Sequence, residues 1–599
     1  MTCYLTSRDD RFAAAIAGGV VSDLSSVGGT SDLGHFLSGT ENGGLPWRDR
    51  ELLAAQSPFT QVDRVTTPTL ILHGAADDRC PVGQAEQWFT ALRERDVPTR
   101  LVLYPGGSHL FVLSGPPSHR ADYSRRVIDW VEQYAPPAGK PVRARLDARH
   151  WQQRLSALAA AHKVPGATLG MVRLGEEPVY AHHGILNVRT GIETTDDSVF
   201  QIGSMGKVWT TTAIMRLVDQ GVLDLDAPVV SYVPEFSSVD PEITRTVTLR
   251  HLLNHTSGID GDVFTDTGRG DDTLEKYVAH LDGVAQNHPV GATMSYCNSG
   301  FSLAGRVIEK VTGTTWDQAM RDLVFTPLGL THSSTLPEEA IMFRAASGHT
   351  VVDEDGPHLA PAWMLPRSMG PAGLINSTTA DVLAFARMHL EGGLAADGTR
   401  VLSEAAVARM QEREVDMPDP YSLGDAWGVG WILFDWDGHR LFGHDGNTIG
   451  QASFLRILPE EGLAVTLLTN GGNTHDLYVE LFGEIFRELA GLKLPAGLTP
   501  PDEPFTDDFS EFEGVYDRSG VRTEIFRDDH GLRMRTTING PLAALLPDPV
   551  QEHPLVPVRR GEFVMRPEGE QAWHAVVFYS LPTGERYLHH GVRAAPKVS

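Results

Sequence analysis

The sequence predicts a multidomain protein in which an α/β region, a larger α+β region and a small antiparallel β region follow one another. A chain of 599 residues is too long for one compact domain. Proline-rich stretches interrupt it at residues 135–148 and 494–508. We therefore expect domains over residues 1–136, 148–493 and 508–599.

Composition is that of an ordinary globular protein, with 41% hydrophobic and 21% charged residues. The formal net charge of −27 argues against binding to nucleic acid or to anionic membranes. The three cysteines fit neither a disulfide framework nor a zinc site. No signal-peptide pattern or membrane-spanning apolar run is visible. We expect a cytoplasmic protein without metal or cofactor and leave its oligomeric state open; an incomplete N-terminus would hide an export signal.

The α/β region alternates predicted strands and helices. Residues 68–72 and 100–104 are short apolar runs typical of buried strands. Residues 81–95 and 123–134 carry apolar side chains at helical spacing. This βαβα order predicts a parallel sheet with helices on its faces.

Two members of a possible Ser-His-Asp triad lie in this region. Asp77 follows the first predicted strand and His109 follows the second. The stretches DRFAAAIAGGVVSDL, TPTLILHGAADDRCPV and LVLYPGGSH resemble the C-terminal part of the prolyl oligopeptidase catalytic domain. The resemblance covers about residues 1–134 and implies Asp77, or alternatively Asp78, as the acid and His109 as the base.

The nucleophile of that triad is not found in the sequence. In this fold it sits in a G-x-S-x-G elbow before the acid and the base, and no serine here has glycine at both positions −2 and +2. Met1-Thr2 resembles the pair that follows the elbow in that family, so the serine would lie just upstream. Either the chain starts inside a longer protein or a domain has lost its first half. We expect a structural or docking remnant with a vestigial triad.

The α+β region has a helix-rich centre and contains a candidate nucleophile and base. FQIGSMGK begins a predicted buried helix, so Ser204 and Lys207 share one face of it. The helix N-terminus stabilises negative charge that develops on Ser204. A partly desolvated lysine can take the proton of a serine hydroxyl. An isolated S-x-x-K pattern occurs by chance, so the further motifs decide its meaning.

Two later motifs follow in order. Tyr296 and Asn298 precede a predicted helix and can point into one cleft, where a phenolate beside a lysine ammonium would be a competent base. His444-Asp445-Gly446 ends the first of three predicted strands. Gly446 would let the backbone approach a substrate closely, and an edge-strand N–H would join that of Ser204 as an oxyanion hole.

The order SMGK, YCN and HDG resembles the serine β-lactamase and penicillin-binding-protein superfamily. The most similar branch is class C-like, with family VIII esterases and D-aminopeptidases, and the resemblance covers about residues 149–492. It implies an acyl-enzyme on Ser204, with the proton transfers shared by Lys207 and Tyr296. It also implies that Asn298 orients the substrate and the lysine, that His444 lines the pocket and that the N–H of Asn447 completes the oxyanion hole.

The third motif departs from penicillin-recognising members, which usually carry Lys-Thr-Gly there. His444-Asp445-Gly446 therefore favours esters, small amides or peptides with a free amino end over β-lactams. Asp445 would either attract a cationic substrate group or be hydrogen-bonded within the protein.

The last hundred residues alternate short polar and apolar segments, such as VRTEIFRD, GLRMRTTI and WHAVVFYS. This pattern predicts a small antiparallel barrel or sandwich. It is similar to lipocalin-like domains appended to some peptidases of the same branch. Such a domain would either cover the cleft and set substrate size or only stabilise the protein.

The function we expect is that of an SxxK serine hydrolase that cleaves a small ester, a peptide or a D-amino-acid amide through a Ser204 acyl-enzyme. One alternative is a truncated prolyl oligopeptidase-type peptidase in which the second region is accessory. The other is a non-catalytic binding protein, against which intact Ser204, Lys207 and Tyr296 argue. His251 and His255 lack the glutamate of a zincin motif, so we expect no metal site there.

Overall fold

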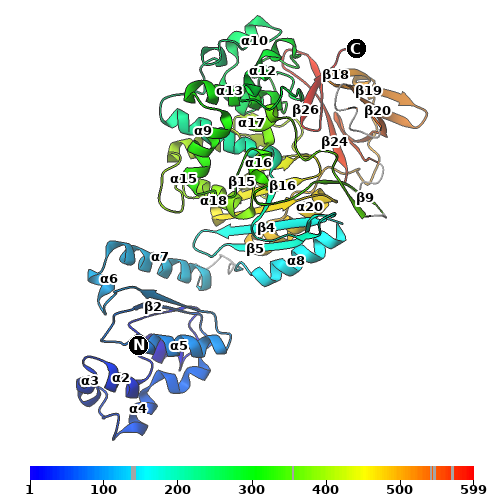
Figure 1. Ribbon diagram of the computed structural model, residues 1–599. Helices are drawn as coiled ribbons and strands as arrows, with labels where there is room; N and C mark the ends of the chain where they lie inside the picture. The colour runs from blue at the N-terminus through cyan, green and yellow to red at the C-terminus, as the bar shows by residue number, and fades with distance from the viewer. Residues whose placement is uncertain (136–143, 354–355, 540–542, 544–547, 568–571) are drawn as a thin grey trace. The chain divides into compact units, whose positions relative to one another are not determined.

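The computed structural model describes residues 1–135, 144–353, 356–539, 543, 548–567 and 572–599. They divide into two compact units, Met1–Ala144 and Arg145–Ser599 (Figure 1). Residues 136–143 of the predicted linker, and with them the end of the predicted first domain, lie outside the described residues. No described helix combines the length and the apolarity that crossing a bilayer requires.

Three parallel strands form the centre of the first unit. They are β1 (Ala15–Gly18), β2 (Thr69–Gly74) and β3 (Thr99–Tyr104), in that order across the sheet. The central strand is buried along its whole length, because a parallel sheet is covered on both faces.

Helices cover both faces of this sheet, as the sequence predicts. On one face α5 (Gly83–Glu94) packs through Trp88, and on the other α7 (Pro117–Tyr134) packs through Trp130 (Figure 1). The remaining helices of the unit are α1 (Thr2–Thr6), α2 (Leu24–Thr30), α3 (Gly34–Thr40), α4 (Arg50–Gln56), η1 (Pro58–Arg64) and α6 (Phe111–Ser114).

A nine-stranded antiparallel sheet organises the second unit. Its strands come from the two ends of the predicted α+β region, because β17 pairs directly with β4. In sheet order they are β12 (Val415–Asp416), β13 (Ala426–Trp427), β14 (Ile432–Trp436), β15 (His439–Asn447), β16 (Ala452–Leu458), β17 (Leu463–Thr469), β4 (Gly166–Arg173), β5 (Val179–Asn187) and β6 (Ile192–Glu193).

Helices pack on both sides of this sheet. On one side α8 (Ala148–Ala161) and α20 (Thr474–Ala490) share an apolar core with the strands. A lobe of helices covers the other side. It contains η2 (Gly203–Met205), α9 (Gly206–Asp219), α10 (Pro241–Thr246), α11 (Leu249–Leu253), α12 (Thr273–Ala279), α13 (Asn298–Thr312), α14 (Trp316–Met320), α15 (Thr326–Leu328), α16 (Pro337–Ala340), α17 (Gly370–Gly373), α18 (Thr379–Leu390) and α19 (Glu404–Met410).

Small sheets complete this lobe. One consists of β11 (Asn376–Ser377), β7 (Ser198–Gln201) and β8 (Arg344–Ala345), and the other of β10 (Gly356–Leu359) and β9 (His349–Asp353). The first of them matters for function, because the chain passes from β7 directly into η2 and α9.

The C-terminal region forms two antiparallel sheets around its own apolar core. Their edges meet at a bridge between Tyr516 and Lys597. Among the described residues the strands do not form one closed sheet, so the predicted lipocalin-like barrel is not confirmed. The strands are β18 (Gly514–Arg518), β19 (Val521–Asp528), β20 (Gly531–Ile538), β21 (Val550–Pro554), β22 (Val556–Arg559), β23 (Glu562–Met565), β24 (His574–Ser580), β25 (Arg586–His590) and β26 (Arg593–Pro596).

Candidate active site

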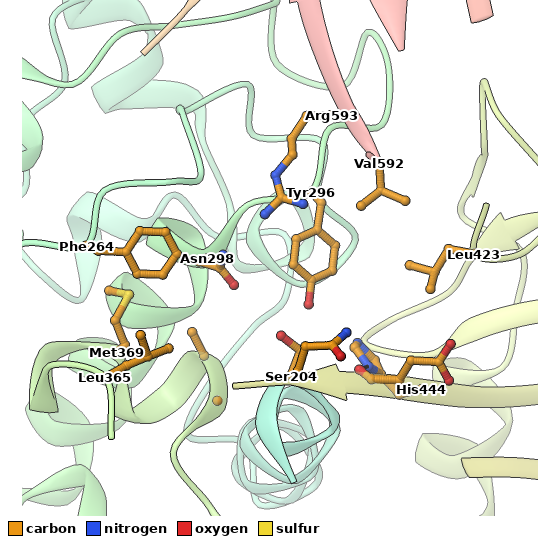
Figure 2. Close-up of a pocket in the computed structure, with 14 residues that line it drawn as sticks. Ser204, Phe264, Tyr296, Asn298, Leu365, Met369, Leu423, His444, Val592 and Arg593 are labelled. Carbon is orange, nitrogen blue, oxygen red and sulfur yellow. Dashed lines mark hydrogen bonds between the residues drawn. The ribbon is translucent and has the colours of Figure 1, made fainter. Parts of the chain in front are cut away.

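Ser204 lies in the tight turn η2 at the N-terminal end of α9, beneath Tyr296 (Figure 2). The turn requires glycine at its first residue, because Gly203 has a φ of +53° and a Cβ there would lie 2.6 Å from the backbone nitrogen of Asn447. The missing side chain therefore lets the end of β15 pack against the turn. As a result Ser204 and Asn447 border the same cavity.

Lys207 is fully buried one helical turn after Ser204, as the S-x-x-K spacing predicts. Its Nζ lies 3.0 Å from Ser204 Oγ, 2.8 Å from Asn298 Oδ1 and 2.5 Å from the Ala372 carbonyl oxygen. Burial lowers the pKa of Lys207 well below its ordinary value.

The neighbours of Lys207 determine where the lone pair of a neutral amine points. The oxygens of Asn298 and Ala372 can only accept hydrogen bonds, so they take the two N–H groups of a neutral lysine. The nitrogen lone pair is then directed at Ser204, whose hydroxyl can donate to it. This arrangement is that of a nucleophile next to its base.

Tyr296 points its hydroxyl at Ser204 (Figure 2). Its ring is held by a stacked contact with His255, at 4.4 Å between centroids, and an edge contact with Trp427. Burial raises the pKa of Tyr296, and the contact with the Ser204 hydroxyl opposes this only in part. These directions favour a neutral phenol beside a neutral lysine, and not the phenolate base that the sequence suggested.

Two histidines of the HLLNH stretch each use Nδ1 to accept a backbone hydrogen bond. His255 Nδ1 accepts from the backbone N–H of Cys297 at 3.0 Å, and His251 Nδ1 accepts from that of Thr248 at 3.2 Å. Cys297 itself caps α13, because its Sγ accepts from the Gly300 N–H at 3.2 Å. Each of these side chains therefore has a structural role in the protein.

His444 lines the cavity as a buried, neutral side chain. Burial lowers its pKa to about 3. Its Nδ1 lies 2.6 Å from the carbonyl oxygen of Asp445, which can only accept, so Nδ1 carries the proton. Its Nε2 has no hydrogen-bond partner within the described parts of the chain. This nitrogen is itself buried, so the third motif places an unpartnered hydrogen-bond acceptor in the wall of the cavity.

The next two residues of this motif, Asp445 and Gly446, mainly make contacts with other parts of the protein. The carboxylate of Asp445 pairs with the buried guanidinium of Arg456, at 3.0 Å between Oδ2 and Nη2, so its charge is neutralised. A Cβ on Gly446 would lie 1.9 Å from the carbonyl oxygen of Ile202. Gly446 therefore brings β15 close to the turn that carries Ser204, and it does not border the cavity itself.

The cavity above Ser204 has a volume of about 270 Å³. Figure 2 shows apolar side chains on two sides of the serine. Val592 and Arg593 come from the C-terminal region of the second unit, and no sequence motif marks them, because they reach the cavity only through tertiary packing. The other lining residues are Phe264, Tyr296, Asn298, Leu365, Met369, Ala372, Gly373, Leu423, His444, Asp445 and Asn447.

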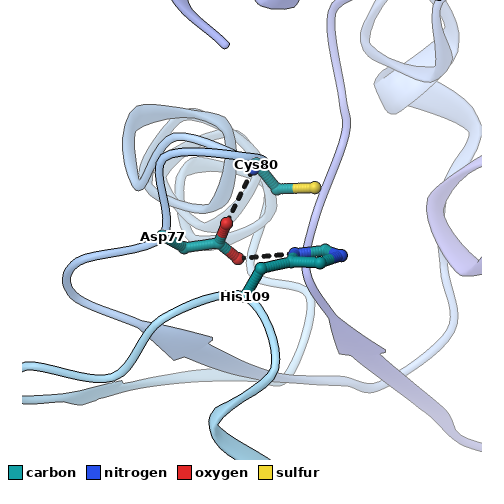
Figure 3. Close-up of side chains that lie close together, drawn as sticks. All are labelled: Asp77, Cys80 and His109. Atoms are coloured by element: carbon teal, nitrogen blue, oxygen red, sulfur yellow. Dashed lines mark hydrogen bonds and ion pairs between the residues drawn. The ribbon is translucent and has the colours of Figure 1, made fainter. Parts of the chain in front are cut away.

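The first unit brings Asp77 and His109 together, as the sequence suggests (Figure 3). His109 Nδ1 lies 3.0 Å from Asp77 Oδ2. The only group of possible metal ligands found in the described residues is this pair with Cys80, at up to 4.8 Å between ligand atoms. Burial raises the pKa of the Cys80 thiol to about 11. Within the described ranges no serine hydroxyl is hydrogen-bonded to His109.

Two family models match the chain. The model described as Beta-lactamase matches residues 151–488, and the model described as Prolyl oligopeptidase family matches residues 1–137. The two matches fall on the two regions in which the sequence shows the corresponding resemblances.

Individual relatives agree with this division. Penicillin-binding protein 4 of Amycolatopsis lactamdurans is 48% identical over 376 residues, which are 62% of this chain and 98% of that protein. The uncharacterized peptidase YuxL of Bacillus subtilis is 37% identical over 134 residues, or 22% of this chain, and the match spans only 20% of its length.

Solved structures share the fold of the second unit. The crystal structure of SurE covers 75% of this chain and 99% of its own, with a TM-score of 0.61 and 25% identity. The octameric penicillin-binding protein homologue from Pyrococcus abyssi covers 76% of this chain and 100% of its own, with a TM-score of 0.51 and 22% identity.

Proposed function

This chain belongs to the Beta-lactamase family of serine hydrolases, and we propose that it cleaves ester or amide bonds through an acyl-enzyme on Ser204. The observation that carries the assignment is the contact of 3.0 Å between Ser204 Oγ and Lys207 Nζ. The buried lysine has oxygen acceptors for both N–H groups of its neutral form, so its lone pair is available to the serine proton.

Acylation begins with proton transfer from Ser204 to the nitrogen of Lys207. Oγ forms a bond to the substrate carbonyl carbon, and the N–H groups of Ser204 and Asn447 stabilise the negative charge on the carbonyl oxygen. When the bond to the leaving group breaks, Tyr296 donates a proton to that group and recovers one from the Lys207 ammonium. Water then attacks the acyl-enzyme, its proton passes to the same lysine, and Ser204 leaves with a proton.

The cavity supports a compact substrate. About 270 Å³ accommodates a small acyl group with a short leaving group, and apolar side chains flank the serine. The unpartnered Nε2 of His444 lies in the cavity wall and can accept a hydrogen bond, which favours substrates whose N–H or ammonium group reaches it. Asp445 adds no net charge, because Arg456 neutralises it. We therefore propose small esters, peptides or D-amino-acid amides over β-lactams.

The other two regions are accessory in this proposal. The C-terminal domain, for which the sequence predicts a lipocalin-like barrel, limits substrate size because Val592 and Arg593 border the cavity. The first unit contributes no chemistry, since its Asp77–His109 pair has no serine partner among the described residues.

Labelling with a fluorophosphonate probe followed by peptide mapping tests the nucleophile. We expect the adduct on Ser204, and Ser204→Ala should lose both the adduct and p-nitrophenyl ester hydrolysis. Ser108→Ala is the matched control, because Ser108 is exposed beside His109, and it should retain both. An unlabelled Ser204, or undiminished hydrolysis by Ser204→Ala, would contradict the proposal.

A further inference from the structure

Asp262 is a largely buried acid, with 11% of its side chain exposed, and is held by two arginines of the C-terminal domain. Its carboxylate accepts from Arg593, at 2.7 Å from Nη2 and 2.9 Å from Nε, and from Arg518 Nη1 at 2.8 Å. Burial alone would raise the pKa of Asp262, but the two guanidinium groups outweigh it and lower the pKa to about 2. The side chain is therefore a carboxylate, which can only accept hydrogen bonds.

The same carboxylate reaches the amide of Asn298. Asn298 Nδ2 donates to Asp262 Oδ1 at 3.4 Å, on the side of the amide that faces away from the lysine. Because the carboxylate cannot donate, the NH2 group of the amide has to face it. Oδ1 is then turned toward Lys207 Nζ, 2.8 Å away. A flipped amide would place its NH2 group against the lysine N–H and leave both without an acceptor.

We propose that Asp262 is a positioning residue for Lys207, and that the C-terminal domain holds it in place through Arg593 and Arg518. This inference rests on the proposed role of Lys207 as base. With Oδ1 of Asn298 fixed, the lysine keeps both acceptors for its N–H groups and directs its lone pair at Ser204. The domain therefore acts on the chemical step and does more than limit the size of the cavity.

Further hydrogen bonds from backbone N–H groups hold the C-terminal domain against the segments that carry Asn298 and Asp262. The Tyr296 N–H donates to the carbonyl oxygen of Val592 at 2.9 Å, and the Ala594 N–H donates to Ser295 Oγ at 3.1 Å. In the segment that carries Asp262, Asp260 Oδ2 accepts a hydrogen bond of 3.0 Å from the Ser519 N–H. The segments that carry Asp262 and Asn298 are thus both fixed by the C-terminal domain.

Charge near Lys207 provides a readout that packing alone would not give. Arg593 lowers the pKa of Lys207 further after burial, whereas Asp262 and Cys297 act to raise it. The other titratable groups around the amine are Tyr296, His255 and His444, all buried. Removing the charge of Asp262 and removing that of Arg593 should therefore shift the pKa of Lys207 in opposite directions.

The test is the pH dependence of kcat and KM for p-nitrophenyl acetate in the full chain. Hydrolysis needs neutral Lys207, so activity falls as the pH drops through its pKa. In Asp262→Ala we expect kcat to fall about 10²-fold with little change in KM, because the base is misplaced, and the acidic limb to move to lower pH. Asp262→Asn keeps an acceptor oxygen for Asn298, so it should recover part of kcat.

Two arginine variants complete the design. Arg593→Gln should move the acidic limb to higher pH. Arg535→Gln is the control, because Arg535 makes similar ion pairs in the same domain, with Glu524 and Glu552, but has no link to Asp262. It should leave kcat and the pH profile unchanged. Melting temperatures and circular dichroism identify any variant that fails to fold. If Asp262→Ala fails to fold, kcat and the pH profile of the isosteric Asp262→Asn decide whether Asp262 positions Lys207.

Wild-type kcat in folded Asp262→Ala, or limbs that shift in the same direction for Asp262→Asn and Arg593→Gln, would overturn the positioning role. These outcomes are distinct from failure of the proposed function, which wild-type labelling reports independently. If Ser204 is labelled and Asp262→Ala behaves as wild type, the inference about Asp262 fails and the assignment of the nucleophile stands.

Discussion

Two regions of this protein each hold a basic side chain bonded to an oxygen acceptor, but within the described residues only one of these side chains is hydrogen-bonded to a serine hydroxyl. Lys207 is 0% exposed and contacts Ser204, whereas the side chain of His109 is 38% exposed and bonds to Asp77. Burial is what lowers the pKa of a lysine enough to make it a base. The two regions therefore differ in the group that the basic side chain contacts, which is a serine hydroxyl for Lys207 and a carboxylate for His109.

The substitution Lys207→Arg gives the largest contrast between the two regions. A guanidinium remains charged at all relevant pH values and cannot accept the serine proton. We expect kcat to fall at least about 10³-fold, within the range for removal of a general base. The wild-type enzyme should lose activity as the pH falls through the lowered pKa of Lys207, because the amine then becomes charged.

The matched substitution in the first unit is His109→Ala, measured with the same ester. We expect its kcat to stay within about twofold of the wild-type value, as for a residue outside the active site. Activity that depends on His109 and survives Lys207→Arg would reverse the comparison. It would favour the prolyl oligopeptidase-like region as the site of catalysis.

Tyr296→Phe should have a smaller effect, because the pair of Ser204 and Lys207 stays intact. The ring contacts with His255 and Trp427 are kept, and only the hydroxyl that protonates the leaving group is lost. We expect kcat for amides to fall about 10²-fold. For p-nitrophenyl esters the loss should be less, since that leaving group departs without protonation.

Steady-state kinetics on one amide and one ester of the same acyl group measures this difference. Tyr516→Phe serves as the control, because its hydroxyl donates to the Phe512 carbonyl oxygen, away from the cavity. Equal losses on both substrates would instead mean that the phenol acts before the leaving group departs.

The predictions from sequence were best where the chemistry is local in the chain. Ser204 in the turn η2 and Lys207 in the first turn of α9 are three residues apart, so local spacing brings them together. Asp262 and Arg593 are 331 residues apart and meet only when two domains dock, so no motif could show their contact. Burial also raises the pKa of Tyr296, which disfavours the phenolate considered from the sequence, and this burial depends on tertiary packing that no motif could show.

The same limit applies to the fold. Apolar periodicity predicted the parallel sheet of the first unit, since each strand and helix carries its own pattern. The lipocalin-like barrel that the sequence also predicts is not confirmed, because closure depends on pairing between distant strands, which local patterns do not show. Gly446 was expected to make room for a substrate, whereas it makes room for the Ile202 carbonyl. A glycine in a sequence motif indicates that another group packs close to the backbone, but it does not identify that group.

The smallest effect on hydrolysis is expected for Asp77→Ala. This substitution instead tests how much the pair of Asp77 and His109 stabilises the first unit. Asp77 Oδ1 accepts from the backbone N–H groups of Arg79 and Cys80, at 3.0 and 2.8 Å. Removal of the carboxylate leaves these donors unsatisfied, so the unit should lose about 1–3 kcal/mol of stability. His109→Ala should cost less than about 1 kcal/mol, because its partly exposed ion pair is screened by water.

Hydrogen–deuterium exchange of peptides from β2 and β3 measures this stability, and ester hydrolysis is followed in the same samples. Faster exchange in Asp77→Ala with unchanged hydrolysis would establish the acid as a structural residue that organises its loop. If His109→Ala destabilised the unit as much as Asp77→Ala, the imidazole would be the group on which the loop depends. The two substitutions thus measure separately how much Asp77 and how much His109 contribute to the stability of the first unit. The described residues of this unit contain no serine that is hydrogen-bonded to the pair.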